Sequence, residues 1–397
     1  MSRAVMRHGT SAVCVLLIIL TCVSCATLRG APGALPDIEP GQRPSLDTDE
    51  AGLWMLMDRV ETSLRTSGGL VTDPGLTTYV RGVVCQLAGS YCPDIRVYVI
   101  QTPHFNATMA PNGAIAVWTG LILRTQNEAQ LAYILGHELG HYLRRHSVQM
   151  WRDVRSTSDL LVLFNVLAAA AGVGYAGNLG QLIALGSLYA FSRDNEREAD
   201  DVGFELMVKA GYDPHEAPKI WEALIKERDA AKDPAPFIFF ATHPPTEERI
   251  ATLRKLAQEA AAQGGPAVVG KDRFVAATRP LRATFLRDEL RQREFARSQI
   301  VLDHLIDTGV GLGELYFFQG ELHRLRAEPG DEAKAITAYQ RALEAGDAPI
   351  ETHRALGLLY AKAGDKQKAR LALQRYLRGR PDAEDRAMIQ RYLQQLD

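Results

Sequence analysis

Apolar residues recur at helical spacing along most of the chain. From about residue 47 onward, two stretches place apolar side chains three or four positions apart, the pattern of a helix that buries one face. They hold Leu53, Met57, Val60 and Leu64, and then Leu76, Val80, Val83, Val84 and Leu87. Further helices are predicted from about residue 127 past residue 141, over 179–209, over 215–229 and after Thr246. The pattern predicts a mainly α-helical fold.

Two short segments have the character of strands. Residues 95–100 alternate and are rich in β-branched side chains. A second strand is predicted over 114–118, behind the turn-forming residues 110–113, and it would run antiparallel to a neighbour. Few other segments read as strands, so the sheet must be small.

The first 25 residues have the pattern of an export signal. Arg3 and Arg7 precede an apolar run over 13–20, and small or polar residues follow. The run is shorter than the roughly 20 apolar residues that span a membrane. The alternative is a buried core helix, but the position at the very N-terminus favours export.

The end of this signal also resembles a bacterial lipoprotein processing site, in which Cys25 would be the lipidated residue. Cys22 stands where that pattern prefers leucine, so lipidation is one of two open alternatives. A lipid on Cys25 would give the otherwise soluble protein contact with a membrane surface. Four prolines and several glycines over 26–46 then predict an extended tether.

We predict a compact domain over residues 47–262, a Gly- and Pro-containing linker over 263–284 and a repeat domain over 285–397. Within the repeat domain, residues 335–343 align with 369–377 at an offset of 34 (369 − 335 = 34). This is the period of the tetratricopeptide repeat, a helical pair. Two clear repeats are fewer than a solenoid needs to be stable by itself, so we expect them to pack against the preceding domain. The alternative is a tail of generic helical hairpins.

One internal stretch, residues 160–177, is rich in apolar residues, Gly and Ala. It would form either a helical hairpin packed on the domain or a helix that dips into a membrane. Gly172, Gly174 and Gly177 weaken a continuous helix, and the apolar length is marginal for a span. We therefore expect the hairpin.

Charge and cysteine content narrow the class of protein. The formal net charge is −2 and no basic block occurs, which argues against nucleic-acid binding. Outside the leader the chain holds two cysteines, Cys85 and Cys92. In an exported chain such a close pair is a candidate disulfide; otherwise both are independent small apolar residues.

The strongest chemical signal is the sequence His-Glu-Leu-Gly-His at residues 137–141. His137 and His141 are four residues apart, so on a helix they share a face and can hold one zinc ion per chain. Glu138 would then be the general base that takes a proton from water. The pattern also occurs by chance, but an apolar helix around it favours a bound metal, because buried polar groups are otherwise costly.

A third ligand is needed. The pattern with a third histidine fails here, because Ser147 stands at that position. Glu196 is the candidate, at the start of an otherwise apolar helix, and Asp200 one turn later could accept the second ring N–H of a zinc-binding histidine. Glu198 would point elsewhere, solvated or in a salt bridge. A charged helix start that only exploits the helix dipole is the alternative for Asp194 in this segment.

Four motifs together resemble a known family: the HELGH helix, SRDNEREAD at 192–200, Asn106-Ala107 with the strand that ends in WTGL at 118–121, and THPP at 242–245. They are similar to the zinc proteases that include HtpX, the Oma-type protease and the CAAX prenyl endopeptidases. The export signal and the repeats most resemble the periplasmic β-barrel assembly-enhancing members. The resemblance implies a gluzincin-type protease domain, mainly helical with a small sheet, followed by a short α-helical tetratricopeptide solenoid.

The resemblance also implies roles for individual residues. Glu196 would bind zinc and Asp200 would support it, while the strand at Asn106 and Ala107 would pair with the substrate backbone. His243 would lie on a loop that covers the zinc as a regulatory ligand and inhibits the resting enzyme. The alternative for His243 is a histidine in a helix-capping loop.

The expected function is therefore zinc-dependent endopeptidase activity on protein substrates in the periplasm, with the repeats recruiting partners. By resemblance the substrates are stalled outer-membrane β-barrel proteins, the partner is their assembly machinery, and a lipid anchor would lie in the outer membrane. A chaperone or scaffold that binds clients with little proteolysis is the alternative. A membrane-embedded protease would need several long apolar spans, and only residues 160–177 come near one.

Overall fold

The computed structural model describes residues 35–156, 191–231, 239–240, 243–244 and 246–396. The chain divides into two units, Met1–Leu35 and Pro36–Asp397. The predictions for the export signal, for Cys25, for residues 160–177 and for a helix over 179–190 lie outside the described residues.

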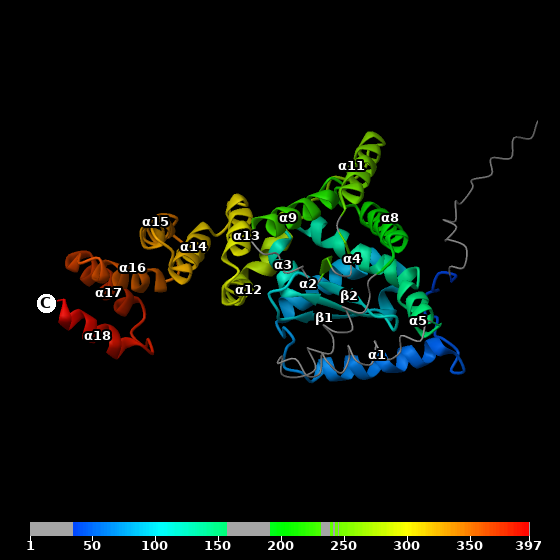
Figure 1. Ribbon diagram of the computed structural model, residues 1–397, viewed down its shortest axis with the longest axis horizontal. Helices are drawn as coiled ribbons and strands as arrows, with labels where there is room; N and C mark the ends of the chain where they lie inside the picture. Colours follow the sequence, from blue (N-terminus) through cyan, green and yellow to red (C-terminus); the bar gives the residue numbers. More distant parts are fainter. Residues whose placement is uncertain (1–34, 157–190, 232–238, 241–242, 245, 397) are drawn as a thin grey trace, which may run out of the picture. The chain divides into compact units, whose positions relative to one another are not determined.

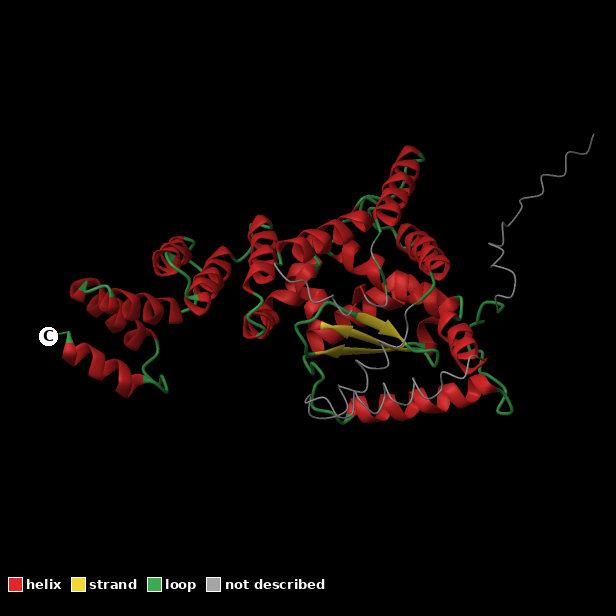
Figure 2. Ribbon diagram, viewed as in Figure 1, coloured by secondary structure: helices red, strands yellow, loops and turns green. Residues whose placement is uncertain are grey.

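A three-stranded sheet forms part of the second unit (Figure 2). Its strands are β1 (Arg96–Ile100), β2 (Ala107–Met109) and β3 (Ala114–Trp118), in the order β1-β3-β2. β3 pairs in parallel with β1 and antiparallel with β2. The second predicted strand therefore has one antiparallel neighbour, and β2 lies at an edge.

Helices make up most of the described chain, and the prediction of a mainly α fold with a small sheet is confirmed (Figure 1). The following elements precede or flank the sheet: α1 (Asp49–Arg65), α2 (Pro74–Ala88), the 3-10 helix η1 (Gly89–Asp94), α3 (Thr119–Arg124), α4 (Glu128–Leu143) and α5 (His146–Ser156). These follow the first undescribed gap: α8 (Arg193–Lys209), α9 (Glu216–Ala230), α11 (Glu247–Ala262), α12 (Lys271–Arg291) and α13 (Phe295–Asp307).

Helix α4 lies in the middle of this core. Along it every residue from Glu128 to Tyr142 is buried, and it packs against α2, α8, α9 and β2. Such a helix is apolar on nearly all sides because neighbours cover all of its faces. The sequence signal and the packing agree, and the HELGH segment is thereby removed from solvent.

The predicted linker is largely helical. Residues 263–270 are not helical and separate α11 from α12. Helix α12 then runs through the rest of the predicted linker and across the expected domain boundary at residue 285. Its Phe274, Phe285 and Leu286 belong to the same hydrophobic core as α4. A proline inside the helix, Pro280, makes this segment look like a breaker in the sequence.

The predicted tether is also partly fixed. Ile38 is 3% exposed and its backbone N–H donates to the carbonyl of Leu143 over 3.1 Å. The hydroxyl of Tyr91 donates to the Ile38 carbonyl, and Arg144 forms an ion pair with Asp37. Around Ile38 this segment therefore packs on the core, because the apolar side chain and the backbone groups of that residue find partners there.

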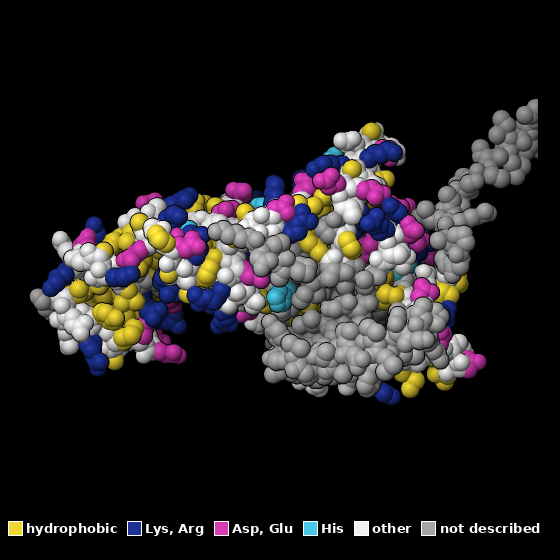
Figure 3. Space-filling view, in the orientation of Figure 1, with side chains coloured by type: hydrophobic (Ala, Val, Ile, Leu, Met, Phe, Trp, Pro, Cys, Tyr) yellow, Lys and Arg dark blue, Asp and Glu magenta, His cyan; other side chains and the backbone are white. Residues whose placement is uncertain are grey.

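The C-terminal helices are α14 (Leu312–Arg326), α15 (Asp331–Glu344), α16 (Glu351–Lys362), α17 (Lys366–Gly379) and α18 (Arg386–Gln395). α14 packs on α15, and α16 on α17, as two helical pairs that hold the two aligned segments. In the space-filling view, both signs of charge are interspersed and hydrophobic side chains gather over the last helices (Figure 3). The assignment of the pairs as tetratricopeptide repeats stays a prediction.

Candidate metal centre

Helix α4 begins at a well-formed cap. The side chain of Asn127 accepts a hydrogen bond from the backbone N–H of Gln130, as an N-cap residue does. His137 and His141 follow on one face and are 0% and 1% exposed. Between them Glu138 is 2% exposed. Three polar side chains thus lie in an apolar core, where each needs a partner.

Helix α8 supplies the opposite wall. The side chain of Ser192 caps it by accepting from Asn195 N–H, and its first turns carry Glu196 and Asp200, both buried. The helix begins at Arg193, later than the predicted start near residue 179, because Phe191 and Ser192 are not helical.

The side chains of four residues converge between these walls. His137, His141, Glu196 and His243 each offer a nitrogen or oxygen atom, and all four atoms lie within 4.8 Å of one another. His137 Nε2 is 3.1 Å from His141 Nε2, and Glu196 Oε1 is 3.4 Å from His141 Nε2. The structure therefore brings together the three residues predicted to bind zinc and His243, the predicted regulatory ligand.

These residues fit a zinc ion. Two imidazoles and one carboxylate, with a further position open to water or substrate, are a donor set of catalytic zinc sites. Oε2 of Glu196 forms an ion pair with Arg249 Nη1 at 2.7 Å, and Oε1 faces His141 Nε2 at 3.4 Å. Burial also lowers the pKa of His141 well below its usual range, which keeps that ring neutral as a ligand requires.

Glu138 lies beside the cluster. Its Oε1 is 3.6 Å from His243 Nε2 and has no hydrogen-bond partner in the described chain. Burial raises the pKa of Glu138, while His243, His137 and the Met109 backbone N–H act in the opposite direction. The carboxylate is thus a buried acceptor next to the ring nitrogens, where a general base would be needed.

Asp200 holds the ring of His137 in place. Its Oδ1 is 3.0 Å from His137 Nδ1, and it also accepts from Tyr133 Oη. Arg249 donates to both oxygens of Asp200 over 2.6 and 2.7 Å. Burial raises the pKa of Asp200, but Arg249 outweighs it and lowers the pKa to about 2. The carboxylate therefore stays ionised and fixes the N–H of His137 on Nδ1, with Nε2 free to face the cluster.

His243 is held inside the cluster. Its Nδ1 lies 2.8 Å from Glu196 Oε1 and 3.2 Å from His137 Nε2, and the residue is 2% exposed. Its backbone N–H donates to Phe239, whose ring lies 4.5 Å from the imidazole. His243 is therefore buried among the candidate metal ligands, which its place in a helix-capping loop alone does not explain.

The edge strand passes next to α4. Ala107 begins β2, and Asn106 immediately precedes it with its side chain 1% exposed. Neither polar atom of the Asn106 amide has a hydrogen-bond partner in the described part of the chain. No described strand pairs with the outer edge of β2, and an edge strand of this kind can pair with the backbone of another chain.

Two residues at the site were not assigned these positions from the sequence. Arg249 is an ion-pair partner of both Glu196 and Asp200 and lies over the ring of Trp221 at 4.5 Å, so its contacts are those of a structural ion pair. His146 was not predicted as a site residue, and it lies 2.9 Å from His141. Its only signal was a further histidine five positions after the motif.

The remaining candidates lie elsewhere. Cys85 and Cys92 form a disulfide that joins α2 to η1, with their Cα atoms 4.8 Å apart. No described helix has both the length and the apolar character to cross a membrane.

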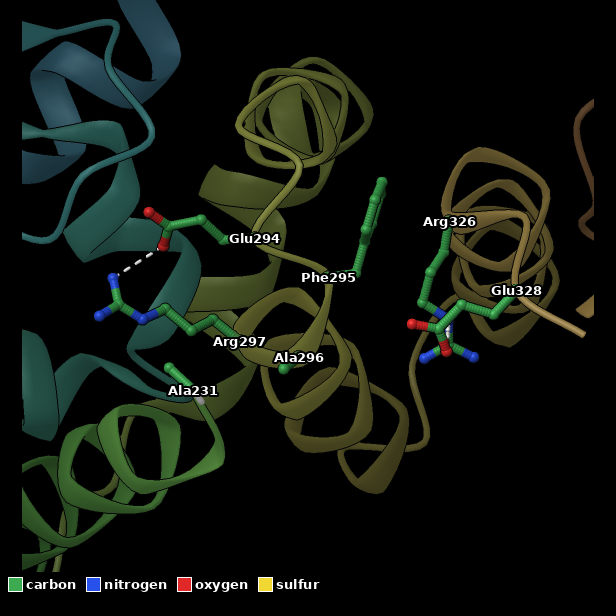
Figure 4. Close-up of a pocket in the computed structure, with 7 residues that line it drawn as sticks. All are labelled: Ala231, Glu294, Phe295, Ala296, Arg297, Arg326 and Glu328. Atoms are coloured by element: carbon green, nitrogen blue, oxygen red, sulfur yellow. Dashed lines mark hydrogen bonds and ion pairs between the residues drawn. The ribbon is translucent and has the colours of Figure 1, made fainter. Parts of the chain in front are cut away.

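A separate cavity of about 380 Å³ opens near the start of α13 (Figure 4). Its lining includes two charged pairs, Arg297 with Glu294 and Arg326 with Glu328. These cations are matched by neighbouring acids, so we assign no ligand to this cavity.

Residues 72–257 match the profile of Peptidase family M48. The chain is 29% identical over 234 residues to the beta-barrel assembly-enhancing protease of Escherichia coli strain K12, covering 57% of this chain and 47% of that protein. A putative beta-barrel assembly-enhancing protease of Vibrio cholerae is 28% identical over 59% of this chain and 49% of its own length. The mitochondrial metalloendopeptidase OMA1 of Schizosaccharomyces pombe is 34% identical over 46% of this chain and 54% of its own length. The chain thus spans about half the length of these relatives.

Proposed function

Because residues 72–257 belong to peptidase family M48, we propose that this protein is a zinc-dependent endopeptidase of the cell envelope. The convergence of His137, His141 and Glu196 around one point, with Glu138 beside it, carries the proposal. His137 and His141 would bind through Nε2, and Glu196 would bind through its carboxylate.

The residues divide the chemistry among themselves. Bound zinc would supply Lewis acidity, which polarises a peptide carbonyl and lowers the pKa of water. Glu138 would take the proton of the attacking water and deliver it to the amine that leaves. Its burial supports this role, because burial raises the pKa of Glu138 and so favours a carboxylate that can both accept and return a proton. Asp200 would keep the proton of His137 on Nδ1.

The substrate would be an extended protein segment. It would add as a strand to the edge of β2 that no described strand occupies, and the amide of Asn106, which has no partner among the described residues, would hydrogen-bond to its backbone. Ala107 would pair through its backbone at the same edge. Recognition through backbone groups suits an enzyme that cleaves unfolded or stalled chains of varied sequence.

His243 would hold the resting enzyme in an inhibited state. Its imidazole lies among the other three ligands, where the attacking water has to enter, and it would leave when the loop moves. Replacing His243 with Ala should raise basal cleavage of casein several-fold without lowering the bound zinc. Replacing the exposed His215 with Ala is the matched control. Cleavage that is unchanged or lower in His243→Ala argues against inhibition by this loop.

The cellular role rests on relatives and on the C-terminal helices. The relatives from Escherichia coli and Vibrio cholerae are named a beta-barrel assembly-enhancing protease, the latter as putative, and we propose the periplasm as the location and stalled outer-membrane barrel proteins as the substrates. The helical pairs α14–α15 and α16–α17 would recruit those clients or their assembly machinery. A lipid on Cys25 would keep the protein at the membrane.

Metal analysis and casein cleavage test the central proposal. Wild type and Glu138→Gln should bind one zinc per chain, and only the wild type should cleave. Glu196→Ala should weaken zinc binding and abolish cleavage, whereas Glu205→Ala, an exposed glutamate on the same helix, should change neither. Absence of zinc from the wild type would overturn the metalloprotease assignment. Zinc without cleavage, even with His243 replaced, would favour the chaperone or scaffold.

A further inference from the structure

The two ring nitrogens of His141 face different surroundings. Nε2 faces the cluster, 3.1 Å from His137 Nε2 and 3.4 Å from Glu196 Oε1. Nδ1 faces away from it and lies 2.9 Å from Nδ1 of His146. His146 is 0% exposed, so this contact lies away from bulk solvent.

The proton positions follow from this arrangement. A neutral imidazole that binds a metal through Nε2 must carry its proton on Nδ1. His141 Nδ1 then donates, and Nδ1 of His146 has to accept, which places the proton of His146 on Nε2. That Nε2 lies 3.2 Å from Glu198 Oε2. One choice of tautomer for each of the two histidines therefore gives every ring nitrogen in the series His141–His146–Glu198 a partner.

Glu198, at the end of this series of contacts, is held by a second interaction. Glu198 also lies 3.3 Å from Arg144 Nε through its other oxygen, and its side chain is 27% exposed. An ionised carboxylate that is ion-paired on one side makes a strong acceptor for a histidine N–H on the other. Glu198 is thus in a salt bridge with Arg144, and its second carboxylate oxygen faces His146.

A strained turn brings His146 back to the metal-binding helix. Arg145 joins α4 to α5 with φ +56°, a left-handed conformation that non-glycine residues rarely adopt. Its side chain forms an ion pair with the buried Glu50 and donates to the Pro36 carbonyl. A conformation held by such anchors, next to a functional cluster, points to a role for the residue that it places.

We propose that His146, backed by Glu198, is a positioning residue that fixes the tautomer and orientation of His141 as a zinc ligand. The inference rests on the proposed function, because it takes His141 to bind zinc. Each histidine ligand then has its own partner: Asp200 orients His137 directly, and Glu198 orients His141 through His146. Such partners commonly change metal affinity when they are removed.

Zinc affinity, measured by competition with a chromogenic chelator, tests this inference together with thermal unfolding in the presence and absence of zinc. His146→Leu should weaken zinc binding about 10- to 100-fold. His146→Asn should lose less, because its amide oxygen can take the place of Nδ1 as the acceptor. Glu198→Gln should lose less than His146→Leu, since an amide oxygen still accepts. His304→Leu, a half-buried histidine on α13, is the control and should bind zinc like the wild type.

The outcomes separate the two hypotheses. Wild-type zinc affinity in His146→Leu would overturn the positioning role alone. Equal losses in His146→Leu and His146→Asn, with an equal fall of the metal-free unfolding temperature, would show a packing role and overturn it too. A wild-type protein that binds no zinc would overturn the proposed function and this inference with it.

Discussion

At the scale of single residues, Glu61 shows how one carboxylate joins a helix to the sheet. It lies on α1 and accepts from Arg96 Nε over 2.6 Å, from Tyr98 Oη over 2.6 Å and from Asn112 Nδ2 over 3.1 Å. Burial alone would raise the pKa of Glu61, but the hydrogen bonds from Arg96 and Tyr98 outweigh it and lower the pKa. The ionised form is therefore favoured in the folded protein.

This shift predicts a pH-dependent contribution to stability. A lowered pKa in the folded state stabilises the protein above the unfolded value of about 4.3, and the contribution disappears as the pH falls through the folded pKa. Glu61→Gln should lower the free energy of unfolding by about 1–3 kcal/mol at pH 7. The difference from wild type should shrink below about pH 4. Urea unfolding at several pH values measures this, with the exposed Glu205→Gln as control; a difference that stays constant down to pH 3 would refute it.

The site residues differ in how far the sequence alone predicts them. His137, Glu138 and His141 could be found because a helix fixes their relative positions, and Glu196 because the missing third histidine required a carboxylate. His146 could not be found in this way. Its approach to His141 depends on the turn at Arg145, which has a left-handed backbone conformation. No local sequence pattern predicts that conformation for an arginine.

At the scale of elements, glycines set the distance between the two helices that carry the ligands. A Cβ atom on Gly203 of α8 would lie 2.6 Å from the backbone nitrogen of His137 on α4. A Cβ on Gly136 would lie 2.9 Å from the Gly203 carbonyl oxygen. Both contacts are with backbone, which cannot rotate away. The approach therefore requires glycine, and it brings Glu196 within reach of the two histidines.

Gly203→Ala should force α8 away from α4. We expect a loss of about 1–3 kcal/mol in the free energy of unfolding, as for other overpacked cores, together with weaker zinc binding. Gly82→Ala on α2 is the matched control, since a Cβ there meets nothing within 4 Å. Urea unfolding and zinc titration would measure both effects. Wild-type zinc affinity in Gly203→Ala would contradict the role of the glycine in spacing the ligands.

Element type was predictable where a periodic pattern was long. The helices around residues 53–64, 76–87 and 215–229 follow from apolar spacing, and the structure has α1, α2 and α9 there. β2 has only three residues, too few for an alternating pattern to be recognised. The helix α12 was missed because glycine and proline signal breaks locally, whereas burial of its apolar side chains against the core decides the outcome.

At the scale of the whole molecule, a buried charge cluster ties distant parts of the chain together. Arg124 of α3 is paired with Glu227 of α9 at 2.7 Å and with Glu289 of α12 at 3.0 Å, and all three side chains are less than a tenth exposed. Ser298 of α13 donates to Glu289 as well. Four helices from a span of about 180 residues thus share one cluster, which explains why α12 and α13 belong to the core.

Arg124→Met should therefore destabilise the fold as a whole. It would leave Glu227 and Glu289 buried without their shared cation, and breaking a buried pair in this way costs about 3–5 kcal/mol. The carboxylates of Glu227 on α9 and Glu289 on α12 would then repel each other, so α12 and α13 should lose protection from hydrogen exchange first. Arg254→Met is the control, because its ion pair with Glu222 is largely exposed and contributes at most about 1 kcal/mol. A loss below about 1 kcal/mol in Arg124→Met, measured by urea unfolding, would mean that apolar contacts alone hold α12 to the core.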